Sequence, residues 1–261
     1  MRESDSEYAI GPYDPEIIKP EFKTKGNEMA DIVTYSFKDG VAIIAMDDGK
    51  ANALGSSVWA ELNTALDKAE AENAIVVITG RDGMFSGGFD LKEMQSSPKD
   101  ALLLTSKGSK FARRIMAFPR PVILAASGHT IAMGAFLALA CDYRMIKDGA
   151  YKTGLNETMI GMTMHNFGIE LGRYRLTNQY FNRCVINAEI FTPKDAVRAG
   201  FFDRVVPADQ WDMTIAGAAQ MFGQLNETAF KGTKLRSRKA IFAILDQAIE
   251  DDLDPAKVHA V

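Results

Sequence analysis

The sequence predicts an α/β fold with a helical C-terminal part. Apolar segments of strand length alternate with amphipathic helical segments from residue 32 to about residue 160. After Gly161 the expected helices dominate. Strands that alternate with helices are typical of a largely parallel sheet, and a later run of helices adds a helical part to that sheet. No linker rich in Pro, Ser or Gly separates the two parts, so we expect one structural unit.

The first expected elements are two short strands at residues 32–37 and 41–46. They flank Asp39-Gly40, a hairpin signal. Gly55, Ser56 and Ser57 offer caps for a helix with apolar residues at helical spacing. Residues 74–79 form a continuous apolar run, typical of a strand buried on both faces.

Turn residues rich in glycine follow from residue 80 to residue 88. Beyond them we expect helices at 99–117 and 131–140 and strands at 122–126 and 143–146. The helices expected after Gly161 lie at about 168–182, 192–199, 210–225 and 227–249.

The composition narrows the functional classes. The net charge of -4 gives no general attraction for a polyanion, and no apolar run approaches the ~20 residues of a membrane span. Two cysteines are too few for a disulfide framework and fit a reducing, cytoplasmic setting. Residues 1–28 carry three prolines and no apolar middle, so we interpret them as a loosely ordered extension or leader. The expected domain is 29–261, with a core at about 29–207 and a helical region at about 208–261.

Two segments after buried strands carry the chemistry. Residues 85–91 read Phe-Ser-Gly-Gly-Phe-Asp-Leu, and the paired glycines allow a sharp turn and close approach of a ligand. Residues 127–136 lead from a strand into a helix, whose first free N–H groups favour negative charge. An ordinary strand-to-helix turn explains either segment alone.

Together the two segments resemble the crotonase (enoyl-CoA hydratase/isomerase) superfamily. Residues 49–54 resemble that family's N-A-L turn, and residues 85–91 its F-S-A-G-x-D-L segment. Residues 141–144 resemble its C-D-x-R strand, and residues 191–207 its A-x-x-x-G-x-V-x-x-V-V-P block. Several motifs in the same order make a chance likeness improbable.

The resemblance implies the crotonase (ClpP-like) fold, in which repeated ββα units form a spiral core. It implies an acyl-coenzyme A substrate whose thioester enolate is held by the backbone N–H groups of Phe89 and Met133. Two such donors lower the barrier because they face the oxygen on which charge develops. It also implies a homotrimer or hexamer, with no cofactor beyond the coenzyme A of the substrate, and we expect no metal. Substrate-binding residues are expected at Ala51, Gly87, Gly88, Asp90, Leu91 and Gly134.

The residues at the family's two acid positions distinguish isomerisation from hydration. Hydratases of the family divide the proton transfers between two glutamates, and Phe136 stands at the first of these positions. Residues 154–161 fit the second position, with Glu157 as the acid and one extra residue after Asp142. The run G-L-N-E-T resembles the mitochondrial-type 3,2-enoyl-CoA isomerases, which use one glutamate. We therefore expect Δ3-Δ2 isomerisation in fatty-acid oxidation, in which Glu157 takes a proton from C2 and returns it to C4.

Two enzymatic alternatives stay open. A hydratase would need a second acid, for which His165 or Glu170 would serve. A hydrolase would use His129, beside the second loop segment, together with an acid. A lone histidine in a turn is more often simply hydrogen-bonded.

The C-terminal basic run raises a further alternative. Lys231 and Lys234 begin this run on an expected helix, which the family places near the nucleotide end of coenzyme A. Cations there would meet phosphates, although a solvated helix face explains the run equally well. A crotonase-fold protein that binds acyl-CoA or RNA without catalysis therefore stays open. The net charge and the retained Glu157 argue against binding of nucleic acid.

Overall fold

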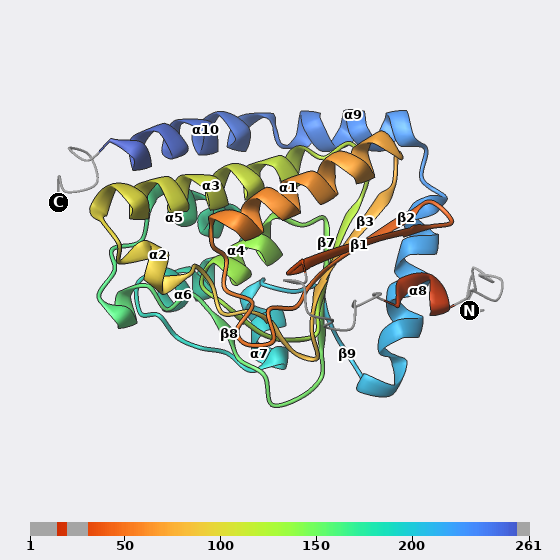
Figure 1. The fold of residues 1–261 in the computed structure, drawn as a ribbon, viewed down its shortest axis with the longest axis horizontal. Helices are drawn as coiled ribbons and strands as arrows, with labels where there is room; N and C mark the ends of the chain where they lie inside the picture. The colour runs from red at the N-terminus through yellow and green to blue at the C-terminus, as the bar shows by residue number, and fades with distance from the viewer. Residues whose placement is uncertain (1–14, 20–30, 255–261) are drawn as a thin grey trace, which may run out of the picture.

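A six-stranded sheet forms the centre of the fold (Figure 1). The computed structural model describes residues 15–19 and 31–254 of the chain. The hairpin strands β1 and β2 are antiparallel, and the other neighbouring strands run parallel. In spatial order the strands are β1 (Val33–Lys38), β2 (Val41–Met46), β3 (Ile75–Gly80), β5 (Val122–Ala126), β7 (Tyr143–Lys147) and β9 (Arg204–Val206).

The predicted hairpin at Asp39-Gly40 is confirmed. Both residues have positive φ angles, 51° and 79°. A two-residue turn of this kind needs such angles to match the twist of its strands.

A second, three-stranded sheet was not predicted. It consists of β4 (Gly83–Ser86), β6 (Gly128–Ile131) and β8 (Thr153–Gly154), all parallel. The expected turn at 80–88 and the expected start of a helix at residue 131 are therefore wrong. Glycine permits the close pairing, because a Cβ at Gly128 would lie 1.9 Å from the carbonyl carbon of Gly83. Each strand of this sheet follows a strand of the main sheet and precedes helical structure, which gives repeated ββα units.

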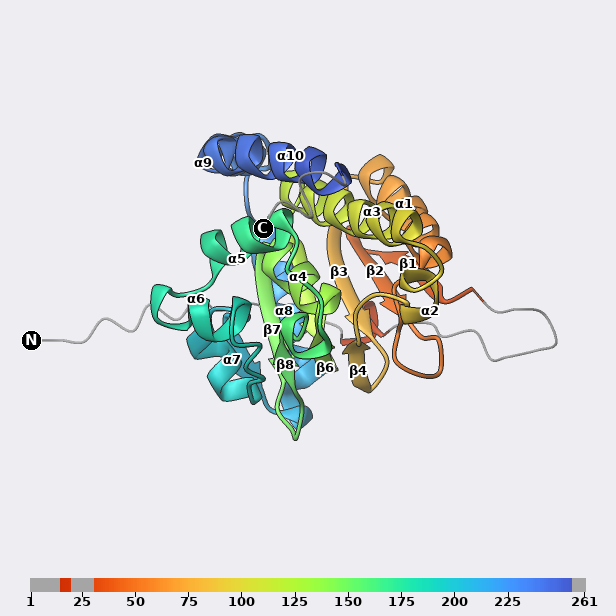
Figure 2. The same ribbon diagram turned by 90° about the vertical axis from the view of Figure 1, so that its left-hand side faces the viewer.

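Helices gather over one face of the main sheet (Figure 2). The apolar side of α1 (Ser56–Ala71) packs with α3 (Pro98–Ala117) and α4 (Met133–Ala140) in the larger core cluster. The last helix, α10 (Lys239–Leu253), packs on α3 and on α5 (Asn166–Arg175).

The opposite face of the sheet is covered by α8 (Trp211–Gly223) and by a short 3-10 helix, η1 (Pro15–Ile18). Ile18 is 5% exposed and packs in the smaller core cluster. The expectation of a loose leader is therefore wrong for this segment, while most of residues 1–28 lie outside the described residues. A single apolar turn that docks on a remote helix has no periodic signal in the sequence.

Two expected long helices are each divided in two. The first divides into α5 and α6 (Asn178–Val185), because Leu176 and Thr177 are extended. The second divides into α9 (Glu227–Ser237) and α10 at Arg238. The remaining helices are α2 (Leu91–Met94), η2 (Thr158–Ile160), α7 (Pro193–Ala199) and η3 (Ala208–Gln210). Within the described part of the chain, no helix is long and apolar enough to cross a membrane.

A buried ion cluster attaches α9 to the sheet. Asp142, just before β7, accepts a hydrogen bond from Lys234 Nζ at 2.6 Å and pairs with Arg238 at 2.9 Å. All three side chains are less than a tenth exposed. Arg238 also donates to the carbonyl of Met116, at 2.8 Å. The C-terminal helix is therefore divided at Arg238, the residue whose cationic side chain is buried in the core.

Candidate active site

The first loop of the site follows β4 and is held by Asn52. The amide of Asn52 is buried and donates to the carbonyl oxygens of Met46, Met84 and Phe85, at 2.9–3.2 Å. The backbone of Gly87 donates to Ala51 at 2.8 Å. These bonds fix the loop, yet the N–H of Phe89 donates to no group in the described part of the chain. An unpaired amide is thereby held in a rigid loop.

The second loop ends at Ala132, whose backbone is strained. Its φ of 51° and ψ of -122° are unfavourable for a residue with a Cβ, at a cost of about 1–3 kcal/mol. A hydrogen bond of 2.9 Å from its N–H to the carbonyl of Gly154 holds it in place. The next residue, Met133, opens α4, so its N–H has no partner inside the helix. No other described residue accepts from it. The sequence carries no signal for this positive φ.

The two loops touch. A Cβ at Gly88, which has φ 100°, would lie 2.7 Å from the Cβ of Ala132 and 3.4 Å from the backbone nitrogen of Met133. Only glycine fits this approach. The unpaired N–H groups of Phe89 and Met133 therefore belong to two adjoining backbone segments.

A cavity of about 360 Å³ lies beside these loops. It follows the carboxyl ends of the parallel strands, where ligands bind in sheets of this type. Of the predicted site residues, the lining contains Glu157, Phe89 and His165 together with Ala51, Gly87, Gly88 and Leu91. Residues that the sequence analysis did not single out also line it, namely Ala53, Met94, Thr105, Ala132, Asn156, Ile160, Met162 and Thr163.

Glu157 is the one carboxylic acid that lines this cavity. It follows β8 and is 7% exposed, and its backbone carbonyl accepts from the N–H of Met162 at 2.8 Å. Its Oε2 is buried and has no hydrogen-bond partner among the described residues. Burial raises the pKa of Glu157 from 4.5 to about 7, because the charged form loses its hydration. A carboxyl group with this pKa can both accept and return a proton near neutral pH.

His165 lines the same cavity. Its ring is edge-on to Phe136, with the ring centres 5.3 Å apart, and nearly parallel to Phe167 at 6.2 Å. Both phenylalanines are fully buried, so Phe136 lies beneath the cavity and offers no proton. Burial lowers the pKa of His165, and the nearby Asp252 opposes that effect only in part. His165 is therefore neutral at pH 7.

Asp252, on α10, fixes the start of α5. Its carboxylate accepts from the N–H groups of Asn166 and Phe167, at 2.7 and 2.9 Å. Anions are favourable at a helix N-terminus. The C-terminal helix thus holds the segment that carries His165, a role that the sequence analysis missed.

Several predicted residues lie outside the cavity lining. Asp90 caps α2 by accepting from the N–H of Lys92 at 2.8 Å, and Gly134 allows close packing, since a Cβ there would lie 2.8 Å from that of Ser86. His129 accepts a hydrogen bond from the N–H of Lys152 at 3.0 Å and packs edge-on to Tyr151. The alternative hydrolase therefore loses its expected base at the cavity.

The prediction for Lys234 is wrong, because its ammonium group is buried against Asp142 and is not available to a phosphate. Lys231 is exposed on α9 and does not line the cavity, so its contact with coenzyme A stays a prediction. A spacing pattern along one helix does not reveal a carboxylate from a remote part of the chain.

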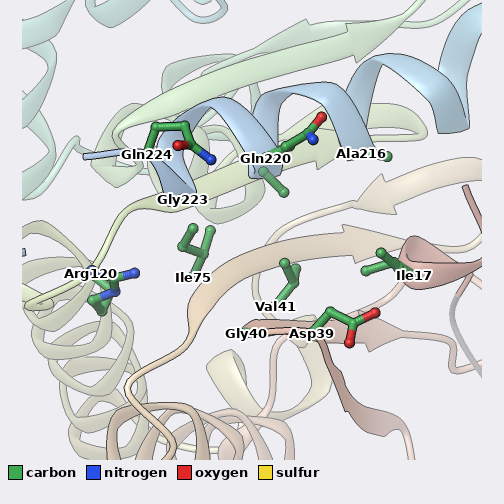
Figure 3. A pocket seen from close by; sticks show the side chains of 11 residues that line it. Ile17, Asp39, Gly40, Val41, Ile75, Arg120, Ala216, Gln220, Gly223 and Gln224 are labelled. Atoms are coloured by element: carbon green, nitrogen blue, oxygen red, sulfur yellow. The ribbon is translucent and has the colours of Figure 1, made fainter. Parts of the chain in front are cut away.

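A larger cavity, of about 540 Å³, lies elsewhere (Figure 3). It is bounded by Gly40 and Ile75, at the beginnings of β2 and β3, and by Gln220 on α8. Arg120 faces it but is paired with Glu227 at 3.0 Å. This cavity lies at the amino ends of the strands, and Glu157 does not line it. We therefore do not assign the reaction to this cavity. In the described residues no group of three or more His, Cys, Asp or Glu side chains could hold a metal ion.

Comparison with known proteins settles the family. Residues 36–253 match the family model described as enoyl-CoA hydratase/isomerase. The chain belongs to this family. An enoyl-CoA hydratase/isomerase family protein from Pseudomonas syringae has 45% sequence identity and a TM-score of 0.85, over 90% of this chain and all of that one. The resemblance and the crotonase-type fold inferred from the sequence are therefore confirmed.

Two further relatives carry different names. The enoyl-CoA isomerase of Mycobacterium tuberculosis is 38% identical, with a TM-score of 0.80, over 85% of this chain and 97% of that one. A probable enoyl-CoA hydratase of Bacillus subtilis is 36% identical over 126 residues, which are 47% of this chain. That match spans about half (48%) of the relative's length. Family membership thus leaves both reactions open.

Proposed function

We propose that the protein isomerises 3-enoyl-CoA thioesters to 2-enoyl-CoA thioesters. The observation that carries the proposal is one buried carboxyl group, Glu157, in a cavity bounded by the loops of Phe89 and Met133. A single acid suits a reaction in which the same proton leaves one carbon and enters another. The steps use only these residues and the thioester.

The reaction runs through a dienolate. The Glu157 carboxylate removes a proton from C2, and the C–H electrons form a double bond between C1 and C2 as negative charge moves to the thioester oxygen. The N–H groups of Phe89 and Met133 donate to that oxygen. Glu157 then returns the proton to C4, where the electron pair of the C3–C4 double bond forms the new C–H bond. The C1–C2 double bond shifts to C2–C3, and the thioester carbonyl is restored. Loss of one such donor typically costs about 3–4 kcal/mol of transition-state stabilisation.

Hydration of a 2-enoyl thioester is the second candidate, and His165 is the observation that favours it. A hydratase needs a second group that handles protons, and a neutral imidazole lines the cavity that contains Glu157. Glu170 does not line the cavity, and its Oε2 forms an ion pair with Nε of Arg173 at 3.5 Å. It is therefore a poor candidate for the second acid.

A spectrophotometric assay separates the two reactions. We expect a 3-enoyl-CoA to gain the absorbance of the conjugated thioester, and a 2-enoyl-CoA to keep that absorbance in the hydration control. Glu157→Gln should abolish conjugation, whereas Glu170→Gln, outside the cavity, should keep it. Loss of the 2-enoyl absorbance without any conjugation would replace the isomerase proposal by the hydratase.

A non-catalytic role is tested by RNA retention on a filter at low and high salt. Binding of nucleic acid would be lost steeply as salt rises; we expect no retention at either concentration. We also propose a homotrimer or hexamer, as the family resemblance implies, and a cytoplasmic location, which the low cysteine content favours. Light scattering after size-exclusion chromatography measures the first, and fractionation of the source cells the second.

A further inference from the structure

Three polar side-chain atoms of residues that line the candidate active site have no hydrogen-bond partner among the described residues. Asn156 Oδ1, Glu157 Oε2 and His165 Nε2 are each buried and without a partner in the part of the chain described. All three residues line the same cavity. Asn52 shows the usual arrangement, in which a buried amide donates to three carbonyls, although five other buried side-chain atoms, among them Arg120 Nε and Gln220 Oε1, also have no partner in the described part of the chain. Since buried polar atoms are normally paired, the partners of these three are expected in the bound ligand or its solvent.

The burial of the lining gives the cavity a direction. Leu91 is 54% exposed and Ile160 is 49% exposed, so these residues form the mouth. His165 is partly exposed, but its Nε2 is buried and its ring packs on Phe136 and Phe167, which are fully buried, so this ring lies on the core side of the cavity. An acyl chain that enters past the mouth and presents C2 to Glu157 therefore extends towards His165.

We propose that the preferred acyl group carries a hydroxyl group beyond C4, bound by Asn156 and His165. The inference rests on the proposed isomerase function and names its substrate class. A hydroxyl group donates one hydrogen bond and accepts others, so it can donate to Asn156 Oδ1 and pair with His165 Nε2. A plain hydrocarbon chain would leave both atoms without water and without a hydrogen-bond partner. A buried polar atom in that state costs binding free energy.

A carboxylate at this position is disfavoured. None of the residues that line the cavity is Lys or Arg. Burial lowers the pKa of His165, so the imidazole supplies no positive charge at pH 7. A second anion would also lie beside Glu157, which must ionise to remove the proton. A neutral hydroxyl group meets the unpaired atoms without these penalties.

The test compares three thioesters on the unaltered protein. The probes are 3-hexenoyl-CoA, 6-hydroxy-3-hexenoyl-CoA and the corresponding 6-carboxylate, hex-3-enedioyl-CoA. We expect kcat/KM for the hydroxylated probe to exceed that for the plain chain by about tenfold. This is the effect expected when one buried polar group is left without a hydrogen-bond partner. The dicarboxylate should react more slowly than the hydroxylated probe.

Variants locate the recognition. Asn156→Leu and His165→Phe each remove one polar partner at similar side-chain volume, and each should bring the ratio of kcat/KM for the hydroxylated and plain probes towards one. His129→Phe removes an imidazole outside the cavity and should keep the ratio of the parent protein. Because the ratio is taken on one preparation, loss of folded protein cancels from it.

The outcomes separate this inference from the proposed function. Isomerisation of the plain chain with equal or greater kcat/KM overturns the hydroxyl inference and leaves the isomerase standing. Preference for the dicarboxylate overturns it as well. If no probe is isomerised, the proposed function and the inferred substrate class are both refuted.

Discussion

Replacing Glu157 by glutamine should stabilise the folded protein at alkaline pH while it abolishes isomerisation. The glutamate is 7% exposed and makes no hydrogen bond through Oε2, so its charge is held without compensation in the part of the chain described. Glutamine has nearly the same shape and no charge. The substitution therefore removes the penalty of burying a carboxylate and little else.

The magnitude follows from the pKa. Burial raises the pKa of Glu157 from 4.5 to about 7, and a tenfold change in proton affinity is worth about 1.4 kcal/mol. The full penalty is thus about 3 kcal/mol. Well below pH 4.5 the group is protonated in the folded and the unfolded chain, so the penalty is absent. Between pH 4.5 and 7 only the unfolded chain releases its proton, so stability falls as pH rises, and above pH 7 the loss is complete.

Urea unfolding of the parent and the variant at several pH values measures this effect. The free energy of unfolding of Glu157→Gln, relative to the parent, should be about 2–3 kcal/mol more favourable at pH 8.5 than at pH 5. Glu170→Gln, outside the cavity, controls for the general effect of losing a carboxylate. The same stability difference at both pH values would refute the claim that burial raises the pKa of Glu157.

Three further outcomes follow from the same geometry. The kcat/KM for isomerisation should rise with pH and level off above about pH 7, because the reaction needs Glu157 as the carboxylate; a pH–rate profile measures this, and a flat profile would exclude Glu157 as the base. Asp142→Asn should lower the free energy of unfolding by about 3–5 kcal/mol, since two buried cations lose their partner; a urea midpoint equal to that of the parent would contradict the buried cluster. Gly88→Ala should lower kcat/KM at least about tenfold, because its Cβ would lie 2.7 Å from that of Ala132 and displace a donor loop. Gly232→Ala, where a Cβ meets nothing within 4 Å, is its control and should instead stabilise α9 by about 0.5–1 kcal/mol in thermal unfolding.

The sequence by itself determined the local features of this protein. The Asp39-Gly40 turn needed only two residues that tolerate positive φ, and the structure has it where the pattern predicts. The continuous apolar run at 74–79 became the buried strand β3. The order of the motifs predicted the family, and the placement of Phe136 and Glu157 predicted one acid at the cavity instead of two. The turn and the strand depend on residue types at short spacing, and the family and its single acid depend on motifs in a fixed order along the chain. An unfolded chain displays both kinds of pattern.

Only the tertiary structure decided what depends on remote partners. Lys234 and the exposed Lys231 look alike in the sequence, but Asp142, which lies just before β7 and 92 residues from Lys234 in the chain, pairs with Lys234 in the core. His129 and His165 were both candidates, for different reactions. In the fold His129 accepts a hydrogen bond from Lys152, and His165 lines the cavity. The second sheet forms because β4, β6 and β8 supply one another's hydrogen bonds, although each is too short to signal a strand alone. The local sequence cannot predict these features, because the interactions that stabilise them exist only once distant segments are packed together.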